Sequence, residues 1–254
     1  MPPLHTSRDF ETELAALRAR AIAMGARCER SVTLALEALW SSAACSVACG
    51  ATCSAPDGAA AGRCSAARRA ADLAAQVMAV DLDIDRDAIE IDALVLRILA
   101  LRQPVADDLR LLTASMKVVR DLERIGDEAV NIAERVAENA GGETSLVRAE
   151  LEVLAEEARL MLESALKAFV DGDVERAHGV LLSDDAVDRR YSAIVVGMGN
   201  HMAERAVNVA RGLLVVRVAK YLERIADHAT NVAESVIFIS RGEDVRHRQL
   251  APAL

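Results

Sequence analysis

The feature that most constrains this chain is an internal repeat. Residues 122–134 match residues 222–234 at an offset of 100, and nine of the thirteen positions are identical. A shorter match precedes it in each half and consists of two aspartates four residues apart: Asp81/Asp85 and Asp184/Asp188. Self-similarity over a fixed offset indicates that each copy is one structural unit. The sequence therefore predicts two halves that contain the same elements in the same order.

Apolar residues recur with a helical period over most of the chain, and glycine or proline separates the periodic segments. The predicted helices cover residues from about 9–39, 70–102, 105–139, 143–171, 174–197 and 201–240. Only six of the 254 residues are aromatic, whereas strands draw on aromatic and β-branched residues. We therefore predict an all-α fold made of two tandem three-helix bundles that are related by the repeat.

Residues 41–69 interrupt the first half. The segment consists largely of alanine, serine, glycine and cysteine, and the second half has no counterpart of it. Gly50, Pro56 and Gly58 argue against a stable helix, so we predict an irregular insertion. We do not interpret its cysteines as a disulfide framework, because no secretory signal precedes them. The expected units are a first bundle at 1–140, a second bundle at 143–242 and a tail at 243–254.

Composition excludes some classes of partner. The chain has 39 acidic and 30 basic side chains, which gives a formal net charge of −9. Nucleic-acid binding needs clustered lysine and arginine, and single-strand binding also uses aromatic platforms, so we do not expect a nucleic-acid partner. The first residues do not resemble a signal peptide, and no apolar run approaches the roughly 18–20 residues of a membrane helix. We expect a cytoplasmic protein.

The repeated helix has two unlike faces. At 100° per residue, Glu123, Asp127 and Asn131 fall within about 80° of one another, with Ile125 and Ala129 on the opposite side. Carboxylate and amide oxygens at such spacing make a site for hard cations. Including the second copy and the aspartate pairs of the preceding helices, the candidate metal ligands are Glu123, Asp127, Asn131, Glu223, Asp227, Asn231, Asp81, Asp85, Asp184 and Asp188.

A salt-bridged, solvated face is the alternative to a metal site. Like charges four residues apart destabilise a helix by a few tenths of a kcal/mol, so something compensates in both halves. Arg120 and Lys220 lie within the acidic stripe of the wheel, and Arg124 and Arg224 border it. These cations could neutralise the carboxylates without any metal, and the sequence leaves both interpretations open.

The run from Asp121 to Glu134, its second copy, and the preceding segment Gln103-Pro-Val-Ala-Asp-Asp-Leu-Arg closely resemble the PhoU family. The resemblance extends over the chain except for the insertion and the last residues. It implies two three-helix bundles side by side, each with a Glu/Asp-x-x-x-Asp motif that can hold a multinuclear cluster of iron or another divalent metal. The motif positions in this sequence are Glu123/Asp127 and Glu223/Asp227.

The resemblance also implies a function. Members of the family are cytoplasmic, often dimeric negative regulators of the phosphate-starvation response. They act through the ATPase subunit of the phosphate transporter and a phosphate-sensing histidine kinase, so contact with the membrane is indirect and no enzymatic activity is expected. One position departs from the pattern: Glu128 stands where a histidine is common, whereas His228 keeps it in the second copy.

The alternative function is a carboxylate-bridged di-metal protein, either a ferritin-like oxidase or a metal-storage bundle. That chemistry uses Glu-x-x-His motifs on two helices that project into one core. Here Gly126 and Ala226 stand three residues after the motif glutamates, so the signature is absent.

Overall fold

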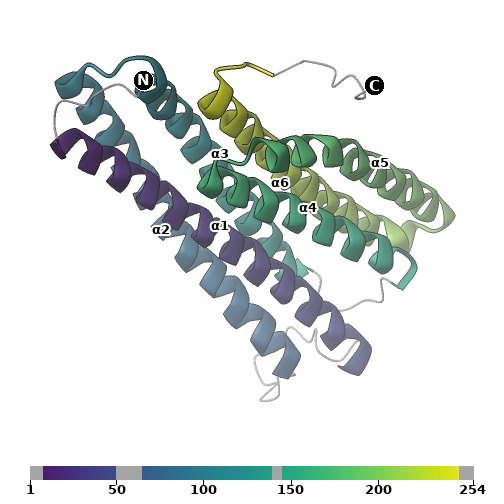
Figure 1. Ribbon diagram of the computed structural model, residues 1–254. Coiled ribbons are helices and arrows are strands. Elements are labelled where there is room, and N and C mark those ends of the chain that lie inside the picture. Colours follow the sequence, from purple (N-terminus) through teal and green to yellow (C-terminus); the bar gives the residue numbers. More distant parts are fainter. Residues whose placement is uncertain (1–7, 50–64, 139–144, 246–254) are drawn as a thin grey trace, which may run out of the picture.

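The chain forms two bundles of three long helices. The computed structural model describes residues 8–49, 65–138 and 145–245, and every regular element in these ranges is helical. The elements are α1 (Arg8–Cys49), α2 (Ser65–Arg102), α3 (Ala106–Glu138), α4 (Ser145–Asp171), α5 (Val174–Glu204), the short 3₁₀ helix η2 (Ala206–Asn208) and α6 (Val209–Arg241). Helices α1–α3 pack together, and α4–α6 form a second bundle beside them (Figure 1). The predicted all-α fold of two three-helix bundles is confirmed.

Aliphatic side chains close each bundle. In α3, Leu122, Ile125 and Ile132 are fully buried, and Leu222 and Ile225 occupy the equivalent places in α6. Their spacing of three and seven residues places them on one face of the helix. The two copies of the repeat therefore bury the same face, which leaves the acidic residues on the other side.

The repeated helices also join the two bundles. α3 and α6 pack against each other, and α1 contacts α4 (Figure 1). α3 and α6 run in opposite directions, because Glu128 pairs with Arg224 whereas the earlier residue Asp121 pairs with the later residue His228. Among the described residues, no helix is long and apolar enough to span a membrane.

The prediction of an irregular segment at 41–69 is wrong at both ends. α1 continues to Cys49 and α2 already begins at Ser65. Alanine has the highest helix propensity of all residues, so a segment poor in large apolar side chains can still extend a helix that is already nucleated. Residues 50–64, with Gly50, Pro56 and Gly58, lie outside the described residues.

The predicted break at Gly197 is also wrong. α5 continues through Gly197 to Glu204, because Ile194 and Met198 are buried and tertiary packing outweighs the low helix propensity of glycine. The chain turns instead at Arg205, which has an extended backbone (φ −153°, ψ 132°). The sequence predicted that the helix ends at the glycine, because glycine has a low helix propensity. The chain turns instead at an arginine, a residue type that does not ordinarily end a helix.

The boundary between α4 and α5 and the end of α6, which carry a glycine or an aspartate, follow the expected capping chemistry. Gly172 and Gly242 both have positive φ, 65° and 70°, which glycine adopts without steric penalty. Asp173 caps α5 by accepting a hydrogen bond from the backbone N–H of Arg176 at 3.0 Å. Val245 is buried in the core, so the packed part of the second bundle extends slightly beyond the predicted limit at 242.

Candidate metal centres

The first candidate centre lies between α2 and α3. Asp85, Asp127 and Glu123 surround Asp81 closely enough to influence its charge. Burial and these three carboxylates raise the pKa of Asp81 to about 6. Its Oδ1 atom is buried and has no hydrogen-bond partner among the described residues. The four predicted carboxylate ligands of the first half are therefore brought together, and one of their oxygens accepts no hydrogen bond among the described residues.

Gly126 allows this close approach of α2 to α3. A Cβ atom at this position would lie 2.9 Å from Asp81 Oδ1 and 3.2 Å from Ile84 Cδ1. The absence of a side chain thus leaves room for the Asp81 carboxylate beside the α3 backbone. Ala226 occupies the same position of the repeat in the second half, so the two centres are not identical.

The second candidate centre lies between α5 and α6. Asp188, Glu223 and Asp227 each offer an oxygen, and these three atoms lie within 4.8 Å of one another. Burial, followed by the charges of Glu223, Asp184 and Asp188, raises the pKa of Asp227 to about 6. Burial and Asp188 also raise the pKa of Asp184. This group has the size and oxygen content of a site for a divalent cation.

Basic side chains compensate part of the charge in both centres. Lys220 donates to Glu223 Oε1 at 2.7 Å, and its ammonium lies 5.3 Å from the centre of the Tyr191 ring. In the first centre, Arg124 Nη1 lies 2.9 Å from Asp127 Oδ2. Two of the four predicted cations, Lys220 and Arg124, thus pair with carboxylates of the centres, whereas Arg224 pairs with Glu128 instead. Asp81 and Asp227 still have raised pKa values.

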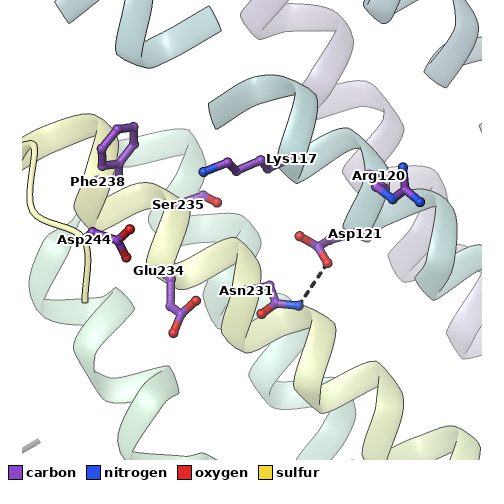
Figure 2. A pocket seen from close by; sticks show the side chains of 8 residues that line it. All are labelled: Lys117, Arg120, Asp121, Asn231, Glu234, Ser235, Phe238 and Asp244. Carbon is purple, nitrogen blue, oxygen red and sulfur yellow. Dashed lines mark hydrogen bonds between the residues drawn. The ribbon is translucent and has the colours of Figure 1, made fainter. Parts of the chain in front are cut away.

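The structure does not bring the two candidate asparagines to these centres. Asn131 donates from Nδ2 to Glu128 Oε2 at 3.2 Å. Asn231 donates from Nδ2 to Asp121 Oδ1 at 3.0 Å, across the contact between α6 and α3 (Figure 2). Both amides lie about 80° around the helix from the first glutamate of their motif, and packing of α3 on α6 takes up that side.

The contact between α3 and α6 contains polar pairs that the sequence did not reveal. Glu128 is 2% exposed and pairs with Arg224, with 2.9 Å between Oε1 and Nη1. Burial raises the pKa of Glu128, although Arg224 and Asn131 oppose that effect. His228 Nδ1 lies 2.9 Å from Asp121 Oδ1. In the sequence, these pairs are indicated only by the difference between Glu128 and His228, which occupy equivalent positions of the repeat. This difference lets the two copies pair with different residues.

A cleft of about 300 Å³ opens beside these pairs (Figure 2). Helices α3 and α6 supply most of its lining, which is Lys117, Arg120, Asp121, Asn231, Glu234, Ser235, Phe238 and Asp244. Lys117 lies 5.5 Å from the centre of the Phe238 ring. The lining mixes both signs of charge, so it does not form a cation site comparable to the two acidic centres.

Comparison with known proteins identifies the family. The PhoU domain matches residues 64–136 and 151–236, which contain both copies of the repeat and both acidic centres. The chain belongs to the PhoU family. The predicted resemblance is thus confirmed, and one of the two matched segments lies in each bundle.

Relatives of similar length are named for phosphate transport. The chain is 36% identical, over 97% of its length and 86% of the relative, to a phosphate-specific transport system accessory protein PhoU homolog of Pseudomonas putida. It is 30% identical, over 96% of its length and 89% of the relative, to the phosphate-specific transport system accessory protein PhoU of Serratia marcescens. Both matches extend well beyond the repeated motif.

Solved structures agree with the fold. The crystal structure of PhoU from Pseudomonas aeruginosa superposes with a TM-score of 0.78 at 34% identity and covers 92% of this chain and 100% of that one. The phosphate transport system regulatory protein PhoU from Streptococcus pneumoniae gives a TM-score of 0.76 at 24% identity, over 93% and 99% of the two chains. The second likeness concerns the fold alone.

The ferritin-like alternative finds no support in the PhoU fold. A di-metal oxidase would direct carboxylates from both halves into one four-helix core. Here each acidic centre lies between two helices of its own half, and Asp85, Asp188 and Asp227 are exposed. The carboxylates therefore belong to the surfaces of two separate bundles.

Proposed function

We propose that this protein regulates phosphate uptake and phosphate homeostasis as an accessory protein of a phosphate transport system. The observation that carries the proposal is the match to named accessory proteins over 96–97% of the chain. In this role it acts as a negative regulator, which restrains the phosphate-starvation response while phosphate is plentiful. The role is one of protein contact rather than catalysis.

The proposed partners are the ATPase subunit of the phosphate transporter, a phosphate-sensing histidine kinase and a second copy of the chain. Such contacts would take place at the cytoplasmic side of the membrane, and the protein would reach the membrane only through its partners. The low aromatic content, six residues in 254, favours interfaces that depend on charge and on aliphatic patches.

The acidic centres are proposed to bind iron or another divalent cation. The orphaned Oδ1 of Asp81 and the three close oxygens of Asp188, Glu223 and Asp227 fit a hard cation with oxygen ligands. A bound cation would neutralise the crowded carboxylates that raise the pKa values of Asp81 and Asp227. Its contribution would be structural and electrostatic, because it would change the charge of a surface that partners contact.

Deletion of the gene tests the regulatory role. Transcripts of phosphate-responsive genes are measured in phosphate-rich medium in the wild type, the deletion strain and a strain that carries the gene on a plasmid. We expect high transcript levels only in the deletion strain. Normal repression in that strain would contradict the proposed function.

Elemental analysis tests the metal proposal independently. Protein purified without chelator should contain a divalent metal in at least stoichiometric amount, and the double variant Glu223→Gln/Asp227→Asn should lose the share held by the second centre. Glu175→Gln is a matched control, because Glu175 is an exposed acidic residue of the second bundle outside both centres. Wild-type protein with only trace metal would contradict metal binding, and equal metal content in all three proteins would contradict binding at the second centre.

A further inference from the structure

An apolar row follows the exposed side of α2. Met78, Leu82, Ile89 and Leu96 are 39%, 70%, 72% and 58% exposed. Exposed alanines at 71, 75, 93 and 100 continue the row in both directions. We call these eight residues the α2 stripe. Their spacings keep them on one face of the helix, and a long row of exposed apolar side chains on one face is typical of an interaction surface.

The three most exposed large residues of the stripe have no apolar counterpart in the second half of the molecule. The aspartate pairs relate α2 to α5 at an offset of 103, and this offset gives the positions in α5 that correspond to Leu82, Ile89 and Leu96. A polar or small residue stands at each of them: Asp185, Ser192 and Gly199. Exposed apolar residues remain in α5 at Val196 and Ala203, the counterparts of Ala93 and Ala100. Folding of a bundle therefore does not require the large exposed side chains at the positions of Leu82, Ile89 and Leu96.

The spacing of the α2 stripe reads the same in both directions. Around a midpoint between residues 85 and 86, its members form pairs equally distant from the centre: 71 with 100, 75 with 96, 78 with 93, and 82 with 89. A two-fold axis brings the same surface of two identical chains together. If two α2 helices cross antiparallel at this midpoint, Leu82 meets Ile89 of the second copy, and the larger side chains farther out meet alanines.

The charges at the midpoint complement each other in the same arrangement. Asp85 and Arg86 occupy the centre, so each would face the oppositely charged residue of the second copy. Within one chain Arg86 pairs with Asp83, and their side chains are 61% and 47% exposed, so this pair contributes little and can be exchanged. Asp85 also belongs to the first acidic centre, and the second copy would place a guanidinium beside that centre.

We infer that the α2 stripe is the interface of an antiparallel homodimer that is centred between Asp85 and Arg86. Residues 71–100 extend over about 44 Å at 1.5 Å per residue, so the contact would follow most of the helix. This inference deepens the proposed function by naming the surface of the proposed homodimer, and it rests on that proposal only for the expectation of a dimer.

Sedimentation velocity of complementary variants tests the register. Wild-type protein should dimerise. Leu82→Glu and Ile89→Lys should each raise the dissociation constant at least about tenfold, because each places an unpaired charge in the apolar contact. An equimolar mixture of the two variants should form dimers again, since residue 82 of one chain faces residue 89 of the other and the new charges pair.

Leu182→Glu is the matched control, because Leu182 on α5 is 69% exposed and lies outside the stripe. It should dimerise as the wild type does, and all variants should keep the helical circular dichroism of the wild type. A monomeric wild type, a control that weakens the dimer equally, or a variant mixture that stays monomeric would overturn the interface. These measurements concern assembly alone, so such results would leave the regulatory role to its own test on gene repression.

Discussion

At the scale of single residues, Asp81 and Asp227 connect the acidic centres to stability. Both carboxyl groups have a pKa of about 6, above the ordinary 3.8, because burial and neighbouring carboxylates disfavour their charged forms. The folded chain therefore holds more protons than the unfolded chain between about pH 4 and pH 6. Without metal, each group favours the folded state at low pH, and that advantage is lost as the pH rises through its folded pKa.

Asp81→Asn should therefore stabilise the metal-free protein at neutral pH. The shift of Asp81 from 3.8 to about 6 corresponds to about 3 kcal/mol for a fully shielded group, and solvent screening at this partly exposed position reduces it to about 1 kcal/mol. Urea unfolding in chelator at pH 4 and pH 7.5 checks this. The difference in unfolding free energy between the variant and the wild type should shift in favour of the variant by about 1 kcal/mol from pH 4 to pH 7.5.

Asp227→Asn provides a parallel case in the other bundle and should show the same sign. Added divalent cation should stabilise the wild type more than either variant, because a ligand that binds only the folded state raises its stability. A variant whose stability depends on pH as strongly as that of the wild type would show that the crowding of carboxylates has no energetic effect.

At the scale of helices, the residues around each glycine decide whether a glycine is tolerated or required. A Cβ atom at Gly197 would meet nothing within 4 Å, whereas one at Gly212 would lie 2.4 Å from Met202 Cγ. Gly212 stands near the start of α6, close to the last residues of α5. One glycine therefore only weakens its helix, while the other permits two helices to approach.

Alanine substitutions at these two positions should have opposite effects. Gly197→Ala should raise the free energy of unfolding by about 0.5–1 kcal/mol, because alanine has the higher helix propensity and no neighbour obstructs it. Gly212→Ala should lower it by about 1–2 kcal/mol, because Met202 must move from a packed position. Urea unfolding of both variants measures the difference. Destabilisation by Gly197→Ala would imply that α5 is interrupted there after all.

The helices show how far sequence reasoning reaches. The repeat and the glycines that separate the periodic segments predicted the number, order and several boundaries of the helices, because these depend on local chemistry. The end of α5 at Arg205 depends on packing against other helices and has no local signature. The acidic centres were predictable because their ligands stand one turn apart on single helices, whereas the direction of the Asn231 amide depends on how α6 docks on α3.

At the scale of the whole molecule, the two bundles are joined by residues at which the two copies of the repeat differ. Glu128 in α3 and His228 in α6 occupy equivalent positions, yet each pairs with a different residue of the opposite half, Arg224 and Asp121. If the two copies of the repeat were identical, the same side chain would stand at both of these positions in the contact between α3 and α6. The mismatch supplies a carboxylate for one contact and an imidazole for the other, so the two copies are not interchangeable.

A double-mutant cycle on Glu128 and Arg224 should measure this coupling between the bundles. Arg224→Met leaves the 2% exposed carboxylate of Glu128 without its cation, which should cost about 2 kcal/mol of unfolding free energy. Glu128→Gln removes the buried charge, so the double variant should lose less than the sum of the two single losses, with a coupling of about 1 kcal/mol or more. The exposed pair Arg20–Glu90, within the first bundle, serves as control and should couple by less than about 0.5 kcal/mol. If the Glu128–Arg224 coupling is no larger than that of the control, this contact does not fix the bundles to each other, and docking of α3 on α6 depends on its other contacts.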